Sequence, residues 1–350
     1  MIKRRQTKEV KVGNIKIGAK NPIIIQSMCN TDTRDSEATI RQIGELQVAG
    51  CELVRVAVPD MKAARALGEI KKHISIPLVA DIHFDYNLAL EAINQGVDKI
   101  RINPGNIGSK DRVKQVVQSA KDKSIPIRIG VNSGSLEKEI LKKHGGPTAE
   151  GMVESALGHV KILEDLDFKD IIIAIKATDV LTMVEAHQLL ATKVNYPHHL
   201  GVTEAGLPWA GTIKSSVGIG SLLTQGIGDT IRVSLTGDPV EEVKVGWEIL
   251  KSLNLRERGR KFISCPTCGR TEIDLVSLAK KVDTATQDID KPITIAVMGC
   301  AVNGPGEARE ADIGVAGAGN KGIIFKKGKV IATVSEAEIL PRLLKEIDSL

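Results

Sequence analysis

Eight short runs rich in Val and Ile recur along the first 235 residues of the chain. Continuous apolar runs of this length are typical of strands buried on both faces, so they indicate a parallel sheet covered by helices. Each run is followed by a polar turn and a segment with helical spacing. Eight such units in about 250 residues match a closed TIM-type barrel, with an open doubly wound sheet as the alternative. The predicted strands are residues 22–28, 53–58, 76–83, 99–105, 125–131, 170–177, 199–206 and 230–235.

The pattern changes after residue 254, where the charged segment "NLRERGRKF" (254–262) indicates a solvated linker. We therefore expect a barrel domain over residues 1–254 and a small α+β domain over residues 255–350. At the other end of the chain, "KEVKVGNIKIG" (8–18) predicts a small hairpin that closes the bottom of the barrel.

Three segments of the second domain have clear local patterns. Residues 291–299 and 311–317 predict strands, and "GIIFKKGKVIATVS" (322–335) predicts a hairpin that turns at Lys327 and Gly328. The closing segment predicts a helix, because Ser335 and Glu338 have the spacing of a capping box. "GAGNKG" (317–322) fits a dinucleotide fingerprint, but no helix follows it, so we interpret it as a tight loop between strands.

Polar side chains interrupt the predicted barrel strands, most of them near the carboxyl ends. Side chains two apart on a strand share a face, and inward residues at this end of a barrel line the active site. The pairs or near pairs on one face are Asp81 and His83, Arg101 and Asn103, Arg128 and Asn132, Lys176 and Thr178, and Arg232 and Ser234, with Arg55 and Glu204 completing the set.

Five of these residues are cations, and buried cations need a counter-charge. Arginine forks match phosphate oxygens bidentately, so a small diphosphate is the predicted ligand. The alternative is that individual arginines point outward and pair with carboxylates on the helices. The five cations are Arg55, Arg101, Arg128, Lys176 and Arg232.

Three cysteines of the second domain, Cys265, Cys268 and Cys300, are candidate metal ligands. A structural zinc site requires a fourth conventional ligand, yet this domain has no second C-x-x-C pair and no histidine. Three thiolates suit a 4Fe-4S cluster with one iron left to a weaker ligand. The spacing offers Glu307 and Glu310 for that position, or both are solvated turn residues. Cys51 is expected to be a small buried residue.

Composition excludes several other classes of function. A formal net charge of +5 and 2% aromatic residues leave little basis for binding nucleic acid. The basic N-terminus is not followed by an apolar run, and no stretch reaches membrane-spanning length. Five cysteines in such a long chain indicate free thiols or metal ligands, and we expect a cytoplasmic protein.

The motifs "SCPTCGR", "VMGCAVNGPGEARE", "ADIGVAG", "KIRINPGNIG", "IRIGVNSGSL" and "GVTEAG" resemble the bacterial 4-hydroxy-3-methylbut-2-enyl diphosphate synthase family over nearly the whole chain. The resemblance implies the two-domain bacterial form and a step of the non-mevalonate isoprenoid pathway. The implied substrate is 2-C-methyl-D-erythritol 2,4-cyclodiphosphate, opened and reduced by two electrons with loss of water. One departure is Cys29, where the family commonly has threonine.

The resemblance also implies roles for single residues. Cys265, Cys268 and Cys300 would bind a 4Fe-4S cluster with Glu307 as the displaceable fourth ligand, and Glu204 would be the proton donor or relay. The roles of Asp81, His83 and Asn103 stay open. The implied diphosphate cradle is Arg55, Arg101, Arg128, Lys176 and Arg232, with hydrogen bonds from Asn132 and Ser234.

The implied partners are a flavodoxin or ferredoxin as electron donor and a second copy of the chain, with each cluster domain covering the partner's barrel. The residues also offer two alternative functions. The first is a non-redox barrel lyase or isomerase with Lys176 as a Schiff-base lysine and a structural zinc, which lacks a fourth zinc ligand. The second is a nucleic-acid-binding module, which the scarcity of aromatic residues disfavours.

Overall fold

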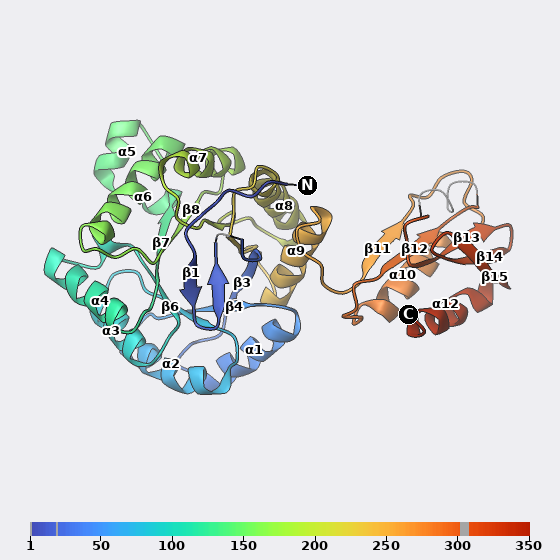
Figure 1. Cartoon of the computed structure of the whole chain (residues 1–350), viewed down its shortest axis with the longest axis horizontal. Helices are drawn as coiled ribbons and strands as arrows, with labels where there is room; N and C mark the ends of the chain where they lie inside the picture. Colours follow the sequence, from blue (N-terminus) through green and yellow to red (C-terminus); the bar gives the residue numbers. More distant parts are fainter. Residues whose placement is uncertain (1, 19, 302–307) are drawn as a thin grey trace. The chain divides into compact units, whose positions relative to one another are not determined.

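A closed barrel of parallel strands forms the first of two units, Met1–Arg256 (Figure 1). The computed structural model describes residues 2–18, 20–301 and 308–350. The sheet order is β8-β7-β6-β5-β4-β3-β10-β9, and a parallel bridge between Ile173 and His198 joins its two ends. The predicted TIM-type barrel is therefore confirmed, and the open sheet is wrong. The strands are β3 (Ile24–Met28), β4 (Leu53–Ala57), β5 (Leu78–Asp81), β6 (Lys99–Ile102), β7 (Ile127–Asn132), β8 (Ile171–Lys176), β9 (His199–Leu200) and β10 (Thr230–Ile231).

Helices surround this barrel and connect consecutive strands (Figure 1). Aspartate recurs at their N-caps: the carboxylates of Asp35, Asp60 and Asp179 accept hydrogen bonds from the backbone of the first turn. This contact satisfies an N–H group that has no partner within the helix, so the sequence fixes where the helix begins. The helices are α1 (Ser36–Val48), α2 (Met61–His73), α3 (Tyr86–Asn94), α4 (Lys110–Asp122), α5 (Lys138–His144), α6 (Ala149–Glu164), α7 (Val180–Lys193), α8 (Pro208–Thr224) and α9 (Pro239–Ser252), with short 3-10 turns at Pro104–Asn106 and Ser133–Ser135.

The amino-terminal end of the barrel is apolar and closed. The hairpin of β1 (Val10–Val12) and β2 (Ile15–Ile17) lies there, as the sequence predicts. Its buried side chains pack against the inward residues at the beginnings of the barrel strands, among them Leu53, Val79 and Ile172. The polar interior therefore begins above a hydrophobic plug and faces the carboxyl ends.

The second unit, Glu257–Leu350, is built around a five-stranded sheet in the order β11-β12-β13-β14-β15. The predicted strands, the hairpin turning at Lys327 and Gly328, and the capping box of Ser335 and Glu338 are all present. One expectation was wrong: Lys261 and Phe262, assigned to the linker, begin β11, which pairs in parallel with β12. The elements are β11 (Lys261–Ser264), α10 (Leu275–Thr286), β12 (Thr294–Met298), β13 (Ile313–Ala318), β14 (Lys321–Lys326), β15 (Lys329–Ser335), a 3-10 turn (Glu336–Glu338) and α12 (Ile339–Asp348).

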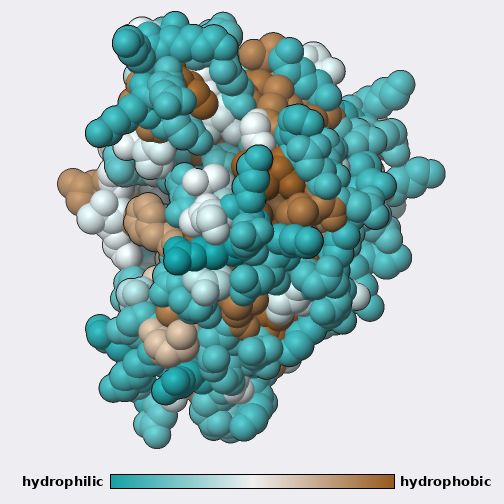
Figure 2. Space-filling view, turned by 90° about the vertical axis from the view of Figure 1, so that its left-hand side faces the viewer, coloured by the Kyte–Doolittle hydropathy of each residue, from teal (hydrophilic) through white to brown (hydrophobic). Residues whose placement is uncertain are grey.

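The "GAGNKG" segment lies in a hairpin, because β13 ends at Ala318 and β14 begins at Lys321 in antiparallel pairing. The interpretation as a tight loop is confirmed. On the surface, the face shown in Figure 2 is mainly hydrophilic, with small groups of hydrophobic residues among hydrophilic ones. Among the residues that the structure describes, no helix has the length and hydropathy needed to cross a membrane.

Candidate active site

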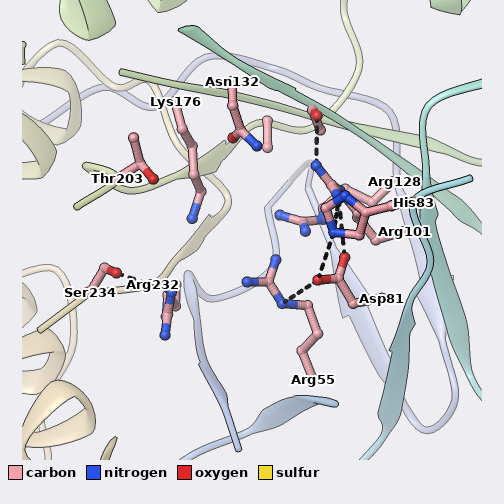
Figure 3. Close-up of a pocket in the computed structure, with 12 residues that line it drawn as sticks. Arg55, Asp81, His83, Arg101, Arg128, Asn132, Lys176, Thr203, Arg232 and Ser234 are labelled. Carbon is pink, nitrogen blue, oxygen red and sulfur yellow. Dashed lines mark hydrogen bonds and ion pairs between the residues drawn. The ribbon is translucent and has the colours of Figure 1, made fainter. Parts of the chain in front are cut away.

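A polar cavity of about 130 Å³ lies inside the barrel at the carboxyl ends of its strands (Figure 3). Its lining comes from five of the eight strands, β4 to β8, and from the segments that follow β5, β9 and β10. The lining residues are Arg55, Asp81, His83, Arg101, Arg128, Gly130, Asn132, Ala174, Lys176, Thr203, Arg232 and Ser234.

All five cations singled out from the sequence line this one cavity, so the alternative that they point outward is wrong, although Arg232 does pair with a helix carboxylate, Glu242 of α9. Asn132 and Ser234 also lie in the lining, as do Asp81 and His83. Four of the five cations are buried, with Arg128 only 1% exposed, and Arg232 is half-buried. Because alternate residues of each strand point inward, the parallel registers bring side chains from distant parts of the chain to one level of the barrel.

Asp81 organises one side of the cavity. Its Oδ1 lies 3.3 Å from Nη1 of Arg101, and its Oδ2 lies 4.0 Å from Nε of Arg55. His83 Nε2 lies 3.4 Å from the same carboxylate. Burial raises the pKa of Asp81, but the charge of Arg55, the hydrogen bond with His83 and the charge of Arg101 outweigh it and hold that pKa below its ordinary value. The carboxylate is therefore ionised and fixes the two arginines.

A second carboxylate, Glu242 of α9, organises the opposite side. It accepts hydrogen bonds from Nε and Nη2 of Arg232, each at 3.2 Å. Nη1 of the same guanidinium donates to Oγ of Ser234 at 3.1 Å. Burial lowers the pKa of Arg232, and Glu242 opposes that shift. Sequence reasoning missed Glu242, because a glutamate in the first turn of a helix is ordinary.

Arg128 and Lys176 differ from the other cations in that they form no ion pair with the described residues. Burial and then the neighbouring charges of Arg55 and Arg101 hold the pKa of Arg128 well below its ordinary value. The pKa of Lys176 is also lowered, by burial and then by Arg55 and Arg232. An anion that enters the cavity would stabilise the charged forms of both side chains. The electrostatics therefore favour a ligand with several negative charges.

Two glycines make room for the long cationic side chains. A Cβ atom at Gly130 would lie 2.5 Å from Nε of Arg101, and one at Gly201 would lie 3.1 Å from Nζ of Lys176. The carbonyl of Gly130 also accepts a hydrogen bond from Arg101 at 2.9 Å, while its N–H donates to Asn103. Asn103 thus supports the cavity wall rather than lining it. Thr203 lines the cavity without having been singled out.

Glu204 and Thr178 lie outside the lining, although the sequence placed them on the same face as the cations. Glu204 is exposed and has a left-handed backbone conformation (φ 52°). The inward and outward alternation of side chains along the strand therefore does not extend to this residue. Its carboxylate accepts a hydrogen bond from the Thr178 hydroxyl at 3.3 Å. Both residues follow the barrel strands, at the same end of the barrel as the cavity.

The three cysteines of the second unit follow its parallel strands. Cys265 comes after β11 and Cys300 after β12, and the backbone N–H of Gly299 donates to Sγ of Cys265 at 3.1 Å. Cys268 N–H donates to Oγ1 of Thr271, whose side chain packs beside Gly299. The loop 265–271 therefore lies over the segment that carries Cys300.

Within the described ranges, no three Cys, His, Asp or Glu side chains converge as a single metal ion would require. A 4Fe-4S cluster is different, because its thiolates bind separate irons and need not meet at one point. Glu307, predicted as the fourth ligand, lies outside the residues that the structure describes. Glu310 is described and exposed.

A TIM-type barrel with a cation-lined cavity at its carboxyl end defines a barrel enzyme for a small anionic substrate. The chain matches the GcpE TIM-barrel domain over residues 7–247 and the GcpE protein C-terminal domain over residues 261–349. It therefore belongs to the GcpE family.

Curated relatives extend over the full chain. One from Clostridium perfringens, 4-hydroxy-3-methylbut-2-en-1-yl diphosphate synthase (flavodoxin), is 61% identical over 347 residues and covers 99% of each chain. Another of the same name from Clostridium acetobutylicum is 60% identical over 349 residues and covers 100% of each. The high identity along both units agrees with the resemblance seen in the motifs.

Solved structures share the fold at low identity. Dihydropteroate synthase from Stenotrophomonas maltophilia matches with a TM-score of 0.53 and 12% identity, covering 71% of this chain and 97% of the other. The sialic acid synthetase of Leptospira borgpetersenii matches with a TM-score of 0.51 and 13% identity, covering 81% and 99%. These similarities support the barrel fold alone.

Proposed function

We propose that the chain converts 2-C-methyl-D-erythritol 2,4-cyclodiphosphate into 4-hydroxy-3-methylbut-2-en-1-yl diphosphate, using two electrons from flavodoxin or ferredoxin. The chain is an iron–sulfur oxidoreductase of the non-mevalonate isoprenoid pathway. The observation that carries the proposal is the convergence of five cations on one barrel cavity in a chain about 60% identical to synthases of that name.

The cavity suits both the binding and the ring opening of a cyclic diphosphate. When the bond between carbon and the ring phosphate oxygen breaks, that oxygen becomes a terminal phosphate oxygen and carries additional negative charge. Fixed cations stabilise charge as it develops and need no reorganisation during the reaction. We assign the diphosphate to the five cations, with hydrogen bonds from Asn132 and Ser234.

The remaining chemistry removes one hydroxyl group as water and adds two electrons. A 4Fe-4S cluster would supply single electrons and a Lewis-acidic iron. We propose Cys265, Cys268 and Cys300 as its thiolate ligands, supported by the folding of the 265–271 loop over Gly299. We propose Glu307 as the fourth ligand and Glu204 as the proton donor or relay. The exposure of Glu204 leaves its carboxyl group free to exchange protons with solvent.

We also propose that two copies act together, with the cluster domain of one covering the barrel of its partner. An exposed apolar stripe on α8 supports association: Trp209, Ile213 and Val217 are 83%, 49% and 53% exposed. They recur every four residues, and Lys214 is the sole charged residue of the helix. Apolar residues together with depletion of charge are typical of homodimer interfaces. Free thiols at all five cysteines fit a reducing cytoplasm, where we place the reaction.

One anaerobic experiment tests the function. The purified chain should be brown, contain about four irons, and turn over the cyclic diphosphate with reduced flavodoxin. Colourless protein that binds one zinc and shows no turnover after cluster reconstitution would contradict the proposal. Arg128→Met should abolish turnover without loss of iron, which separates the barrel assignment from the cluster assignment.

A further inference from the structure

We propose that Glu242 is a positioning residue: it fixes the guanidinium of Arg232 so that Nη1 is presented to the diphosphate. This inference rests on the proposed function, because it concerns the same cavity. Glu242 does not line the cavity, and it acts through Arg232 rather than by touching the substrate.

The contacts of Glu242 hold Arg232 by one edge. Both carboxylate oxygens are occupied by the guanidinium, with Nε on Oε2 and Nη2 on Oε1, each at 3.2 Å. Nη1 takes no part in that pair and donates instead to Oγ of Ser234, which lines the cavity, at 3.1 Å. A bidentate pair of this kind fixes the plane of the guanidinium as well as its position.

Glu242 is itself held from three parts of the barrel. It belongs to the first turn of α9, where Asp238 caps the helix and Pro239 begins it. Its Oε2 also accepts from the hydroxyl of Ser27 in β3 at 3.3 Å, and its Oε1 accepts from the backbone N–H of Leu235 at 2.9 Å. The residue is 4% exposed. The carboxylate therefore couples α9, β3 and the segment after β10 to one arginine.

A positioning role and a purely electrostatic role predict opposite changes in diphosphate affinity for the same variant. In Glu242→Gln, loss of a negative charge makes the cavity more positive and, by charge alone, strengthens anion binding. The amide, however, replaces one acceptor by a donor that faces the N–H groups of Arg232. Repulsion from Arg55 and Arg128 then displaces the released guanidinium, and diphosphate binding weakens.

The experiment measures binding of inorganic pyrophosphate and of the cyclic diphosphate to the full-length protein by anaerobic titration calorimetry. We expect Glu242→Gln to raise both Kd values about tenfold, the loss of roughly one charged hydrogen bond. In turnover assays KM should rise by a similar factor, while kcat stays within about threefold of the value for the unsubstituted protein. The variant loses binding energy that the substrate and the transition state share.

The matched control is Glu241→Gln, which removes the same charge one residue earlier. Glu241 pairs with Lys244 on the surface at 2.8 Å, and its side chain is 54% exposed. Its Kd values should stay within about twofold of the unsubstituted protein. Ser27→Ala serves as a second variant if Glu242→Gln does not fold, and we expect a two- to threefold rise in Kd from the lost hydrogen bond.

A double-mutant cycle with Arg232→Lys tests whether Glu242 acts through that arginine. Lysine cannot form the bidentate pair, so Glu242→Gln should add less than twofold on this background. Unchanged or tighter binding in Glu242→Gln, or full additivity with Arg232→Lys, would overturn the inference. Failure of the unsubstituted protein to bind either ligand would instead overturn the proposed function.

Discussion

The carboxylate of Asp81 lies 3.3 Å from Nη1 of Arg101 and leaves Nη2 of that arginine to donate to the carbonyl of Gly130 at 2.9 Å. The same carboxylate lies 4.0 Å from Arg55. Asp81 is thus the nearest counter-charge for two buried cations while the cavity holds no anion.

We expect Asp81→Asn to lower the free energy of unfolding of the empty protein by about 3 kcal/mol, because removal of one partner leaves buried charges unpaired. Saturating inorganic pyrophosphate should restore part of the loss, because a ligand that binds the folded state stabilises it. Urea unfolding with and without pyrophosphate measures both effects. A loss below about 0.5 kcal/mol would contradict this role for Asp81.

Binding of the diphosphate should take up protons. The pKa of Lys176 lies well below the ordinary 10.5 because of burial and then of Arg55 and Arg232, with Arg128 adding to the effect and Glu242 opposing it. An anion beside the amine raises that pKa, so at pH values between the pKa of the free protein and that of the complex the lysine gains a proton on binding. Calorimetry in buffers of different ionisation enthalpy measures the uptake, which Lys176→Met should reduce. Equal uptake by both proteins would show that another group is responsible.

The lowered pKa of Lys176 also determines how the stability of the ligand-free protein changes with pH. Between the lowered pKa of the folded state and 10.5, the unfolded chain binds more protons at this position than the folded chain does. The free energy of unfolding therefore rises with pH across that window. Denaturation at a series of pH values should show this rise in the unsubstituted protein, and Lys176→Met should flatten it. An unchanged slope would contradict the assignment.

Serine substitution should divide the cysteines into two groups. Cys265→Ser, Cys268→Ser and Cys300→Ser should each lose most of the iron and the brown colour, because a cluster thiolate is removed. Cys29→Ser and Cys51→Ser are the controls: burial raises the pKa of each thiol to about 12, so neither is a ready thiolate. Iron analysis and absorption spectra measure the difference. Iron loss in Cys29→Ser would place that cysteine at the cluster.

Glu307 and Glu310 should also respond differently. Glu307→Ala is expected to keep part of the cluster and lose most turnover, because a hard oxygen ligand on a soft cluster is weakly held yet needed at the reacting iron. Glu310→Ala is expected to keep both cluster and turnover. Iron content and steady-state rates of the two variants provide the test. Similar loss of activity in both would leave neither glutamate as the specific ligand.

Active sites shared between copies should allow complementation. A barrel-deficient Arg128→Met chain and a cluster-deficient Cys265→Ser chain are each expected to be inactive. When the two are mixed and exchange subunits, the mixed dimer has one intact barrel and one intact cluster in different chains. Turnover should then appear. Inactivity of verified mixed dimers would show that each site uses a barrel and a cluster from one chain.

Hydrophobic periodicity predicted the barrel because its strands are buried on both faces, and charges within them marked the inner wall. What the sequence could not show depends on contacts between distant residues. Glu242 looks like any acid in a first helical turn, and only folding brings it to Arg232. Glu204 was misplaced relative to the cavity because a left-handed residue ends the alternation of the strand. Strand β11 was missed because Lys261 and Phe262 follow a run of charges.

The hairpin of β1 and β2 closes the amino-terminal end of the barrel with Val10, Val12 and Ile17. Substrate therefore enters the cavity from the carboxyl-terminal end of the barrel, and the product must leave by the same route. Because the opened diphosphate carries more negative charge than the ring, the cradle retains it strongly. We therefore expect the product to leave the cavity more slowly than unreacted substrate does.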